Sequence, residues 1–242
     1  MTGFVGQSGP VIPNFGEASS CIQENRLFCP DWVRDNWGDV IQPALIQHVK
    51  LTLIAVALGF VISFAAALLT HWLRLVERPF VAFSAIVYTI PSLALFQLLV
   101  PFTGLTLTTV EIALVGYTLV MLFPNIVAGL RSASDDVIEA ARGMGLTRRQ
   151  ILMRIELPLA VPAIIAGLRI AVVSTVAIST IAGINVTSMG LGYPIFSALR
   201  EPTPFKTEIY SAGVLAVSLA ISADLLLIAL RRAVVPWARA TQ

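Results

Sequence analysis

Two charged side chains lie inside long apolar segments of this chain. Arg169 and Asp224 fall in segments that run roughly from residue 160 to 184 and from 210 to 230. If both segments are membrane-crossing helices, the two charges lie at similar depths, because a helix rises about 1.5 Å per residue. A charge within a membrane is costly unless it is paired. We therefore predict an Arg169–Asp224 ion pair that joins the two segments, with a substrate or proton role as the alternative.

The polar segment at residues 134–158 has the local chemistry of two short helices set at an angle. Gly145 can end the first helix, since glycine enters the left-handed conformation cheaply. Thr147 followed by Gln150 three residues later is the pattern of a capping box, which opens a second helix. Pro158 should end that helix.

The first of these two helices has the features of a docking element. Ala140 and Ala141 offer a flat, small-residue surface that another protein can approach closely. Glu139 and Arg142 can make polar contacts at the border of that surface. An ordinary amphipathic helix lying on the membrane surface fits the same pattern, so the residues alone leave both interpretations open.

A proline interrupts another apolar block. Pro91 cannot donate a hydrogen bond to the carbonyl of Val87, so we expect a kink and an exposed acceptor there. Thr89 and Ser92 place hydroxyl groups at the same level. Such a break suits a solute path, and a kink satisfied by a neighbouring helix is the alternative.

The composition places most of the chain in a membrane. Hydrophobic residues make up 57% of the 242 residues and charged residues 12%, against about 25% charged in soluble domains. The apolar residues form blocks of about 20, the length a helix needs to cross the hydrocarbon core. We predict an all-α membrane protein with five spans, roughly His48–Thr70, Phe80–Pro101, Thr108–Leu130, Ala160–Ile184 and Tyr210–Leu230.

Several function classes have no support in the sequence. The chain contains no glycine-rich phosphate loop, no nucleotide fingerprint and no zinc-ligand spacing, so we expect no catalysis, no bound metal and no ATP hydrolysis by this chain alone. A net charge of +2 gives no reason to expect a nucleic-acid partner.

Basic residues predict the orientation, because Lys and Arg are retained in cytoplasmic loops. Ten lie on one side and four on the other. The ten are Arg74, Arg78, Arg131, Arg142, Arg148, Arg149, Arg154, Arg231, Arg232 and Arg239, and the four are Arg26, Arg34, Arg200 and Lys206. We therefore predict an extracytoplasmic tail at residues 1–45, a membrane domain at 46–232 and a cytoplasmic tail at 233–242.

The same orientation places Cys21 and Cys29 in an oxidising space, where a disulfide is permitted. Either a Cys21–Cys29 bond or two free thiols is compatible with the sequence.

A family resemblance is carried by the segment at residues 134–158. Its pattern reads E-A-A, three residues, G, nine residues, I-x-L-P, and the matching positions are Glu139, Ala140, Ala141, Gly145, Ile155, Leu157 and Pro158. This resembles the signature of binding-protein-dependent ABC importer permeases. The resemblance implies a cytoplasmic coupling helix that inserts into a partner ATPase dimer, which binds ATP and Mg. It also implies an extracytoplasmic solute-binding protein, a second permease copy or homologue, and a bacterial inner membrane.

Other motifs are similar to the osmoprotectant branch of that family, which carries glycine betaine, carnitine, choline or proline. They are the run from Thr89 to Pro101, the Gly190-Leu-Gly192 turn and the pair Ile195-Phe196. The residues 182–189 depart from the branch's glycine-rich run, and the N-terminal tail has no counterpart. The branch implies a quaternary ammonium solute, which aromatic faces attract, although aromatic residues in apolar helices commonly only pack. The aromatic candidates are Tyr88, Phe96, Tyr117 and Phe123.

The resemblance further implies that the outer loop at residues 185–209, with a short helix around 194–200, covers the path and meets the binding protein. An inert cover is the alternative. Two other functions stay open at this point: a methionine-type amino-acid importer with the same docking signature, and an ion-coupled secondary carrier, for which that signature would have no use.

Overall fold

The computed structural model describes residues 20–185 and 189–235, and within them every regular element is helical. The helices are α1 (Ser20–Gln23), α2 (Pro30–Asp35), α3 (Gln42–Trp72), α4 (Glu77–Thr89), α5 (Ser92–Thr103), α6 (Leu107–Leu130), α7 (Asp135–Gly143), α8 (Arg148–Ile151), α9 (Leu157–Asn185), α10 (Gly192–Arg200) and α11 (Lys206–Val234). Short π-helical turns at Trp37–Ile41 and Leu152–Glu156 precede α3 and α9.

Four helical stretches are long and apolar enough to cross a membrane: Trp37–Trp72, Leu107–Leu130, Arg148–Gly183 and Lys206–Val234. The pair Arg74–Thr89 and Ser92–Thr103 makes a fifth span when taken together, and it is bent by 102° at its break. The predicted all-α architecture of five spans is therefore confirmed, and the expected kink at Pro91 is a full break.

The break satisfies its own backbone, as an apolar solvent requires. The Ile90 N–H donates to the Val87 carbonyl at 3.3 Å, so the acceptor predicted to be exposed at Val87 has a partner. The Thr89 hydroxyl donates to the carbonyl of Ile86 at 2.7 Å. The hydroxyl of Tyr117, on α6, donates to the carbonyl of Ile90. A neighbouring helix thus helps to satisfy the break.

The prediction that Pro158 ends a separate helix is wrong. The helix that opens with α8 runs through the π-helical turn into α9 without interruption. In that turn the N–H of Leu157 donates to the carbonyl of Leu152, five residues back. The wider turn precedes Pro158, which has no N–H to donate, and π-helical turns are a recognised way to insert such a residue into a helix.

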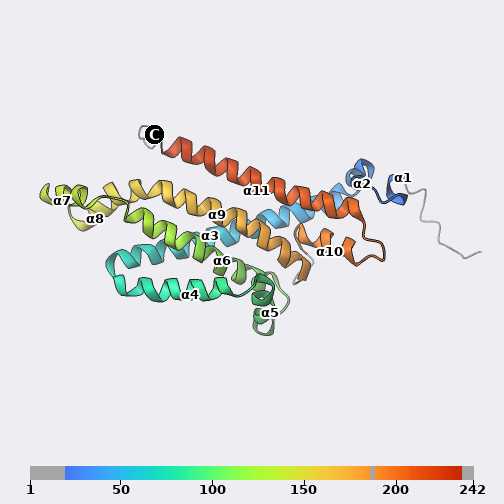
Figure 1. The fold of residues 1–242 in the computed structure, drawn as a ribbon, viewed down its shortest axis with the longest axis horizontal. Coiled ribbons are helices and arrows are strands. Elements are labelled where there is room, and N and C mark those ends of the chain that lie inside the picture. The colour runs from blue at the N-terminus through green and yellow to red at the C-terminus, as the bar shows by residue number, and fades with distance from the viewer. Residues whose placement is uncertain (1–19, 186–188, 236–242) are drawn as a thin grey trace, which may run out of the picture.

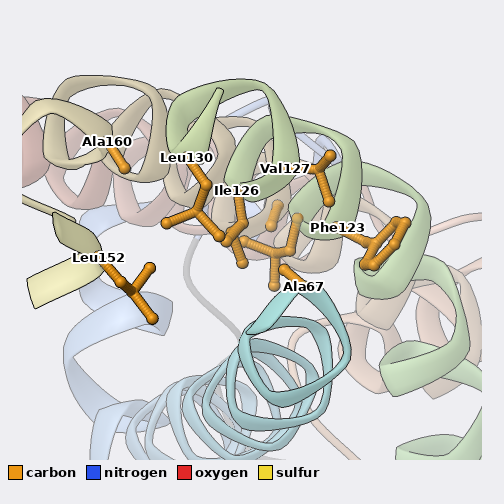
Figure 2. Packing of buried hydrophobic residues seen from close by; sticks show 9 residues of the cluster. Ala67, Phe123, Ile126, Val127, Leu130, Leu152 and Ala160 are labelled. Atoms are coloured by element: carbon orange, nitrogen blue, oxygen red, sulfur yellow. The ribbon is translucent and has the colours of Figure 1, made fainter. Parts of the chain in front are cut away.

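The centre of the packing is α6. In its most apolar stretch 56% of the residues are buried, against 6% in the corresponding stretch of α11. One buried cluster joins α6 to α3, α9 and the π-helical turn before α9 (Figure 2). Its buried members are Ala67, Leu122, Phe123, Ile126, Val127, Leu130, Leu152, Ala160 and Ala171.

The elements separate into two ends (Figure 1). Helices α7 and α8 lie at one end, whereas α1, α2 and α10 lie at the other. The long helices α3, α6, α9 and α11 run between these ends. The segment with Arg142 and Arg148 lies at the opposite end from the cysteine-containing segment, and the assignment of these two ends to the two sides of the membrane stays a prediction.

Close approach of α3 and α6 depends on Gly59. A Cβ atom at this position would overlap the hydroxyl of the buried Thr118 and lie 2.8 Å from its Cβ atom.

We predict that Gly59→Ala lowers the free energy of unfolding by about 1–3 kcal/mol, the usual cost of overpacking. Thermal unfolding in detergent would measure the loss. Gly213→Ala is the matched control, because nothing lies within 4 Å of a Cβ atom there, and equal melting temperatures for the two variants would contradict this packing argument.

Candidate functional site

Helix α7 presents an exposed face at the end of the molecule. Glu139, Ala140 and Arg142 are exposed, whereas Ala141 is only 1% exposed. The structure therefore divides the two alanines that the sequence grouped on one surface: Ala140 faces outward and Ala141 packs inward. The outward surface is still small and close to the backbone.

Two further residues extend this face, and the sequence analysis missed them. Val137 is 45% exposed and Met144 is 73% exposed. Together with Ala140 they follow the spacing i, i+3, i+7, which places them on one side of a helix. That spacing is visible in the sequence and could have indicated an unpaired apolar stripe. We call Val137, Ala140 and Met144 the α7 stripe.

The turn after α7 depends on one glycine. Gly145 has a φ of +83°, which only glycine adopts cheaply. The next helix opens with the predicted capping box: the Gln150 N–H donates to the Thr147 hydroxyl, and the Thr147 N–H donates to Gln150 Oε1 at 2.8 Å. The positive φ at Gly145 and the capping box thus set where α7 ends and where α8 begins.

The second half of the signature does not share the exposed face. Ile155, Leu157 and Pro158 are half-buried and lie in or beside the π-helical turn before α9. Leu157 packs against the cluster shown in Figure 2. The predicted coupling residues thus form two groups, one exposed on α7 and one that fixes α8 to the membrane helices.

A polar hollow of about 680 Å³ lies beside α7. Its polar lining includes His71, Arg74, Arg131, Asp135, Arg142, Arg148 and Glu156. Within it His71 Nδ1 lies 3.3 Å from a carboxylate oxygen of Glu156. At its rim Arg131 donates to both carboxylate oxygens of Glu77, at 3.0 and 2.6 Å. The cationic surface beside the α7 stripe suits an acidic partner.

Deeper in the span region the structure brings Arg169 and Asp224 together. Arg169 Nε lies 2.7 Å from Asp224 Oδ1, and Arg169 Nη2 lies 2.9 Å from Oδ2. This bidentate geometry is the strong form of an arginine–carboxylate pair. It joins α9 to α11, the most weakly buried of the long helices.

The pathway candidates separate by exposure. Tyr88, Thr89 and Pro91 are exposed at the break between α4 and α5, and Ser92 is half-buried. The Tyr88 ring is 54% exposed and lies edge-on to Tyr117, with centroids 6.3 Å apart.

The other aromatic candidates pack inside the protein. Phe96 is 0% exposed, Phe123 is 1% exposed and Tyr117 is 4% exposed. Phe96 belongs to a buried cluster with Leu51 and Leu114. The candidates Phe96 and Tyr117 therefore face neighbouring helices, which is the packing alternative that the sequence left open, because apolarity alone does not reveal which side of a membrane helix faces its neighbours.

His48 is a buried residue whose ring nitrogens contact three polar groups, and no pattern in the sequence singles it out. The Leu191 N–H donates to His48 Nδ1 at 3.2 Å, so Nδ1 carries no proton. His48 Nε2 must therefore hold the proton, and it lies 3.1 Å from the Val176 carbonyl and 2.9 Å from the Ser179 hydroxyl. The neutral ring joins α3, α9 and the turn before α10.

The same turn requires two of its glycines. Gly190 has a φ of +65°, and a Cβ atom on Gly192 would overlap the carbonyl of Thr180 and lie 3.1 Å from Gly183 Cα. The backbone of the turn therefore lies directly against that of α9, which fixes α10 at the end of the spans opposite α7.

At the opposite end from α7, Cys21 and Cys29 form a disulfide. Of the two alternatives that the sequence left open, the structure has the bonded one.

Comparison with known proteins supplies the family. The model of the binding-protein-dependent transport system inner membrane component matches residues 43–240. That range includes α7, the break at Pro91 and the Gly190 turn. The chain belongs to this family. A permease of this kind is a membrane component of a transport system that depends on a binding protein, and the ion-coupled secondary carrier considered from the sequence is not supported.

Two relatives are named as a carnitine permease and a choline permease. The carnitine transport permease protein OpuCB of Listeria monocytogenes is 30% identical over 173 residues, which cover 72% of this chain and 78% of that protein. The choline transport system permease protein OpuBD of Bacillus subtilis is 32% identical over 200 residues, or 82% of this chain and 87% of that protein. Both likenesses span most of the permease.

A solved structure of the MetNI methionine ABC transporter in inward-facing conformations has the same fold. Its matched chain gives a TM-score of 0.69 at 23% identity, with 80% of this chain and 95% of that chain covered. At that identity the likeness shows the fold alone. The helical architecture of this chain is therefore that of the matched MetNI chain.

Gly145 provides a test of the α7–α8 turn. A β-branched residue at a positive φ is strained by about 1–2 kcal/mol or more, so we predict that Gly145→Val displaces α7 and lowers uptake about tenfold or more. Membrane insertion should be unchanged, because the residue is exposed. Uptake by reconstituted permease with its partners measures the effect. Gly143→Ala is the control, since it lies in the helix with open space around it; equal loss in both variants would exclude the turn as the cause.

The pair of Arg169 and Asp224 provides another test. Removing one partner leaves the other charge unpaired, which costs more than removing both. We predict that Arg169→Met and Asp224→Leu each reduce the yield of folded permease, and that the double variant recovers most of it. Size-exclusion profiles in detergent measure the yield. Additive losses in the double variant would show that the two side chains do not stabilise one another.

Proposed function

We propose that this permease is the membrane-spanning subunit of an ATP-driven importer for compatible solutes of the glycine betaine, choline, carnitine or proline type. The observation that carries the proposal is the likeness to carnitine and choline permeases over most of the chain. A methionine-type importer is disfavoured, because its structure shares the fold at only 23% identity.

In this proposal α7 is the coupling helix. The α7 stripe leaves Val137, Ala140 and Met144 open in a segment rich in charge, which supports burial against another protein. Glu139 and Arg142 anchor the border of that contact, and Gly145 sets its angle. The partner is a cytoplasmic ATPase dimer that binds ATP and Mg, and the permease itself contributes no catalytic group.

The path in this proposal runs along the break between α4 and α5. Tyr88, Thr89, Pro91 and the half-buried Ser92 supply an aromatic face, hydroxyl groups and an irregular backbone at one level. Irregular backbone at membrane depth is tolerated where it is buried in protein or lines a cavity. A tyrosine face suits a quaternary ammonium group, which offers no hydrogen-bond donor. A second permease copy or homologue would complete the path.

The same proposal sets the orientation. The N-terminus and α10 lie on the extracytoplasmic side, where a solute-binding protein delivers its cargo, and the C-terminus is cytoplasmic. Support comes from the basic hollow beside α7 and from the disulfide at the other end, since disulfides persist in oxidising spaces.

Reconstitution tests the proposal. The permease, its ATPase and its binding protein are placed in proteoliposomes, and uptake of labelled choline, carnitine, glycine betaine and methionine is compared with and without ATP. We expect ATP-dependent uptake of at least one quaternary ammonium solute and none of methionine. A matched set with an ATPase that cannot hydrolyse ATP is the control.

Two results would contradict the proposal. ATP-independent accumulation would contradict an importer of this class, and ATP-dependent uptake of methionine alone would contradict the proposed substrate.

A further inference from the structure

The disulfide loop between Cys21 and Cys29 precedes the part of the chain that the family shares. The family model begins at residue 43, so nothing in that match gives this loop a role. One side of its disulfide is buried, since Cys29 is 0% exposed, whereas Cys21 is half-buried. A closed loop of this length holds the residues within it in a restricted set of conformations.

One asparagine in the loop reaches a segment far along the chain. Asn25 Nδ2 donates to the Pro204 carbonyl at 2.9 Å, and Asn25 Oδ1 accepts from the Lys206 N–H at 2.9 Å. The two hydrogen bonds therefore fix the backbone on either side of Phe205. Asn25 itself has a φ of +47°, a conformation that asparagine tolerates better than most residues.

These bonds cap α11 from a different element. Lys206 is the first residue of α11, and the residue before it, Phe205, makes no side-chain cap. The first N–H groups of a helix lack partners within the helix, and Asn25 supplies one of them. The side chain of Thr207, which is 0% exposed, donates to the Arg26 carbonyl at 2.9 Å.

An aromatic contact also joins the residues after the loop to Phe205. Trp32, on α2, lies edge-on to Phe205 with ring centroids 5.2 Å apart. From α2 the chain passes through the π-helical turn Trp37–Ile41 directly into α3. The loop and α2 therefore connect the outer end of α3 to the start of α11.

The start of α11 is also fixed to α10. The Phe205 N–H donates to the Ala198 carbonyl at 3.3 Å, and the Ser197 hydroxyl donates to Glu208 Oε1 at 3.0 Å. His48 fixes the other end of α10 to α3, as described above. Contacts within and between residues 20–48 and 190–208 thus hold α3, α10 and α11 together at their outer ends.

We propose that residues 21–32 form an extracytoplasmic clamp in which the disulfide presents Asn25 to the start of α11, and that this clamp is required for productive transport. Asn25 is a positioning residue: it holds α11 in place and touches no solute. With the clamp closed, the outer ends of α3, α10 and α11 move as one body. The second part of the proposal rests on the importer function proposed above, whereas the first part does not.

Hydrogen exchange of the full-length permease in nanodiscs tests the clamp itself. Asn25→Gly keeps access to the positive φ and removes the side chain that carries the carboxamide. We expect amides in residues 204–208 to exchange about tenfold faster in this variant, the effect of losing about one net hydrogen bond. Replacing both cysteines, Cys21→Ser with Cys29→Ser, should produce the same change.

Asn36→Ala is the matched control, because the amide of Asn36 bonds only locally, to the Trp32 carbonyl at 2.9 Å. It should leave exchange at residues 204–208 unchanged. Unchanged exchange in Asn25→Gly and in the double serine variant would overturn the clamp.

ATP-dependent uptake of choline tests the requirement for transport. It is measured in proteoliposomes that contain the permease, its ATPase and its binding protein. We expect a loss of at least about threefold in Asn25→Gly and in the double serine variant, with normal membrane insertion and normal ATPase association. Faster exchange together with undiminished uptake would overturn the functional part. The exchange measurement needs no transported solute, so it decides the clamp even if the importer proposal fails.

Discussion

The constraint on which this structure depends is that hydrocarbon offers no hydrogen-bond partner to a peptide group. Two departures from a regular helix show how a side chain replaces the missing bond. Tyr117 donates to the carbonyl of Ile90 at the break between α4 and α5, and His48 accepts from the N–H of Leu191 before α10. At both places the irregular backbone is therefore held by a side chain from a neighbouring helix.

A second consequence concerns the proposed coupling role, in which a push on α7 has to reach the spans. The capping box fixes α8 relative to the turn at Gly145, and α8 is continuous with α9. Leu152 lies in the cluster with Ala67, Leu130 and Ala160, so the same segment is packed against α3 and α6. Arg169 then joins α9 to Asp224 on α11. Each step is a contact between rigid helices, which leaves few places where the displacement could be absorbed.

The sequence was sufficient for the features that local chemistry determines. Span length, the capping box at Thr147, the glycine turn at Gly145 and the pairing of Arg169 with Asp224 follow from apolar length, spacing and charge, and the structure contains each of them. The five-span fold was likewise predictable, because a membrane restricts the chain to helices of about one length.

What the sequence could not supply is the orientation of helix faces. Nearly every side of the membrane helices is apolar, so the pattern does not tell that Phe96 turns inward while Tyr88 turns outward. On α7 the two adjacent alanines look alike in the sequence, although Ala141 is buried and Ala140 is exposed. The prediction that Pro158 ends a helix failed for a related reason. No residue type indicates the π-helical turn that lets the helix continue past Pro158. Contacts across 180 residues, such as Asn25 with Lys206, have no local signal at all.

The continuity of α8 with α9 turns this part of the molecule into a lever. The rod runs from Arg148 to Gly183, and one close contact with α6 is at Ala160, whose carbonyl would lie 3.0 Å from a Cβ atom on Gly129. At about 1.5 Å per residue, that contact divides the rod into arms of about 18 Å and about 35 Å. A small tilt about that contact, imposed at the short arm beside α7, is therefore roughly doubled at the far tip, beside the turn that holds α10. The ratio of the two arms is set by the position of Gly129, which lets α6 and α9 touch.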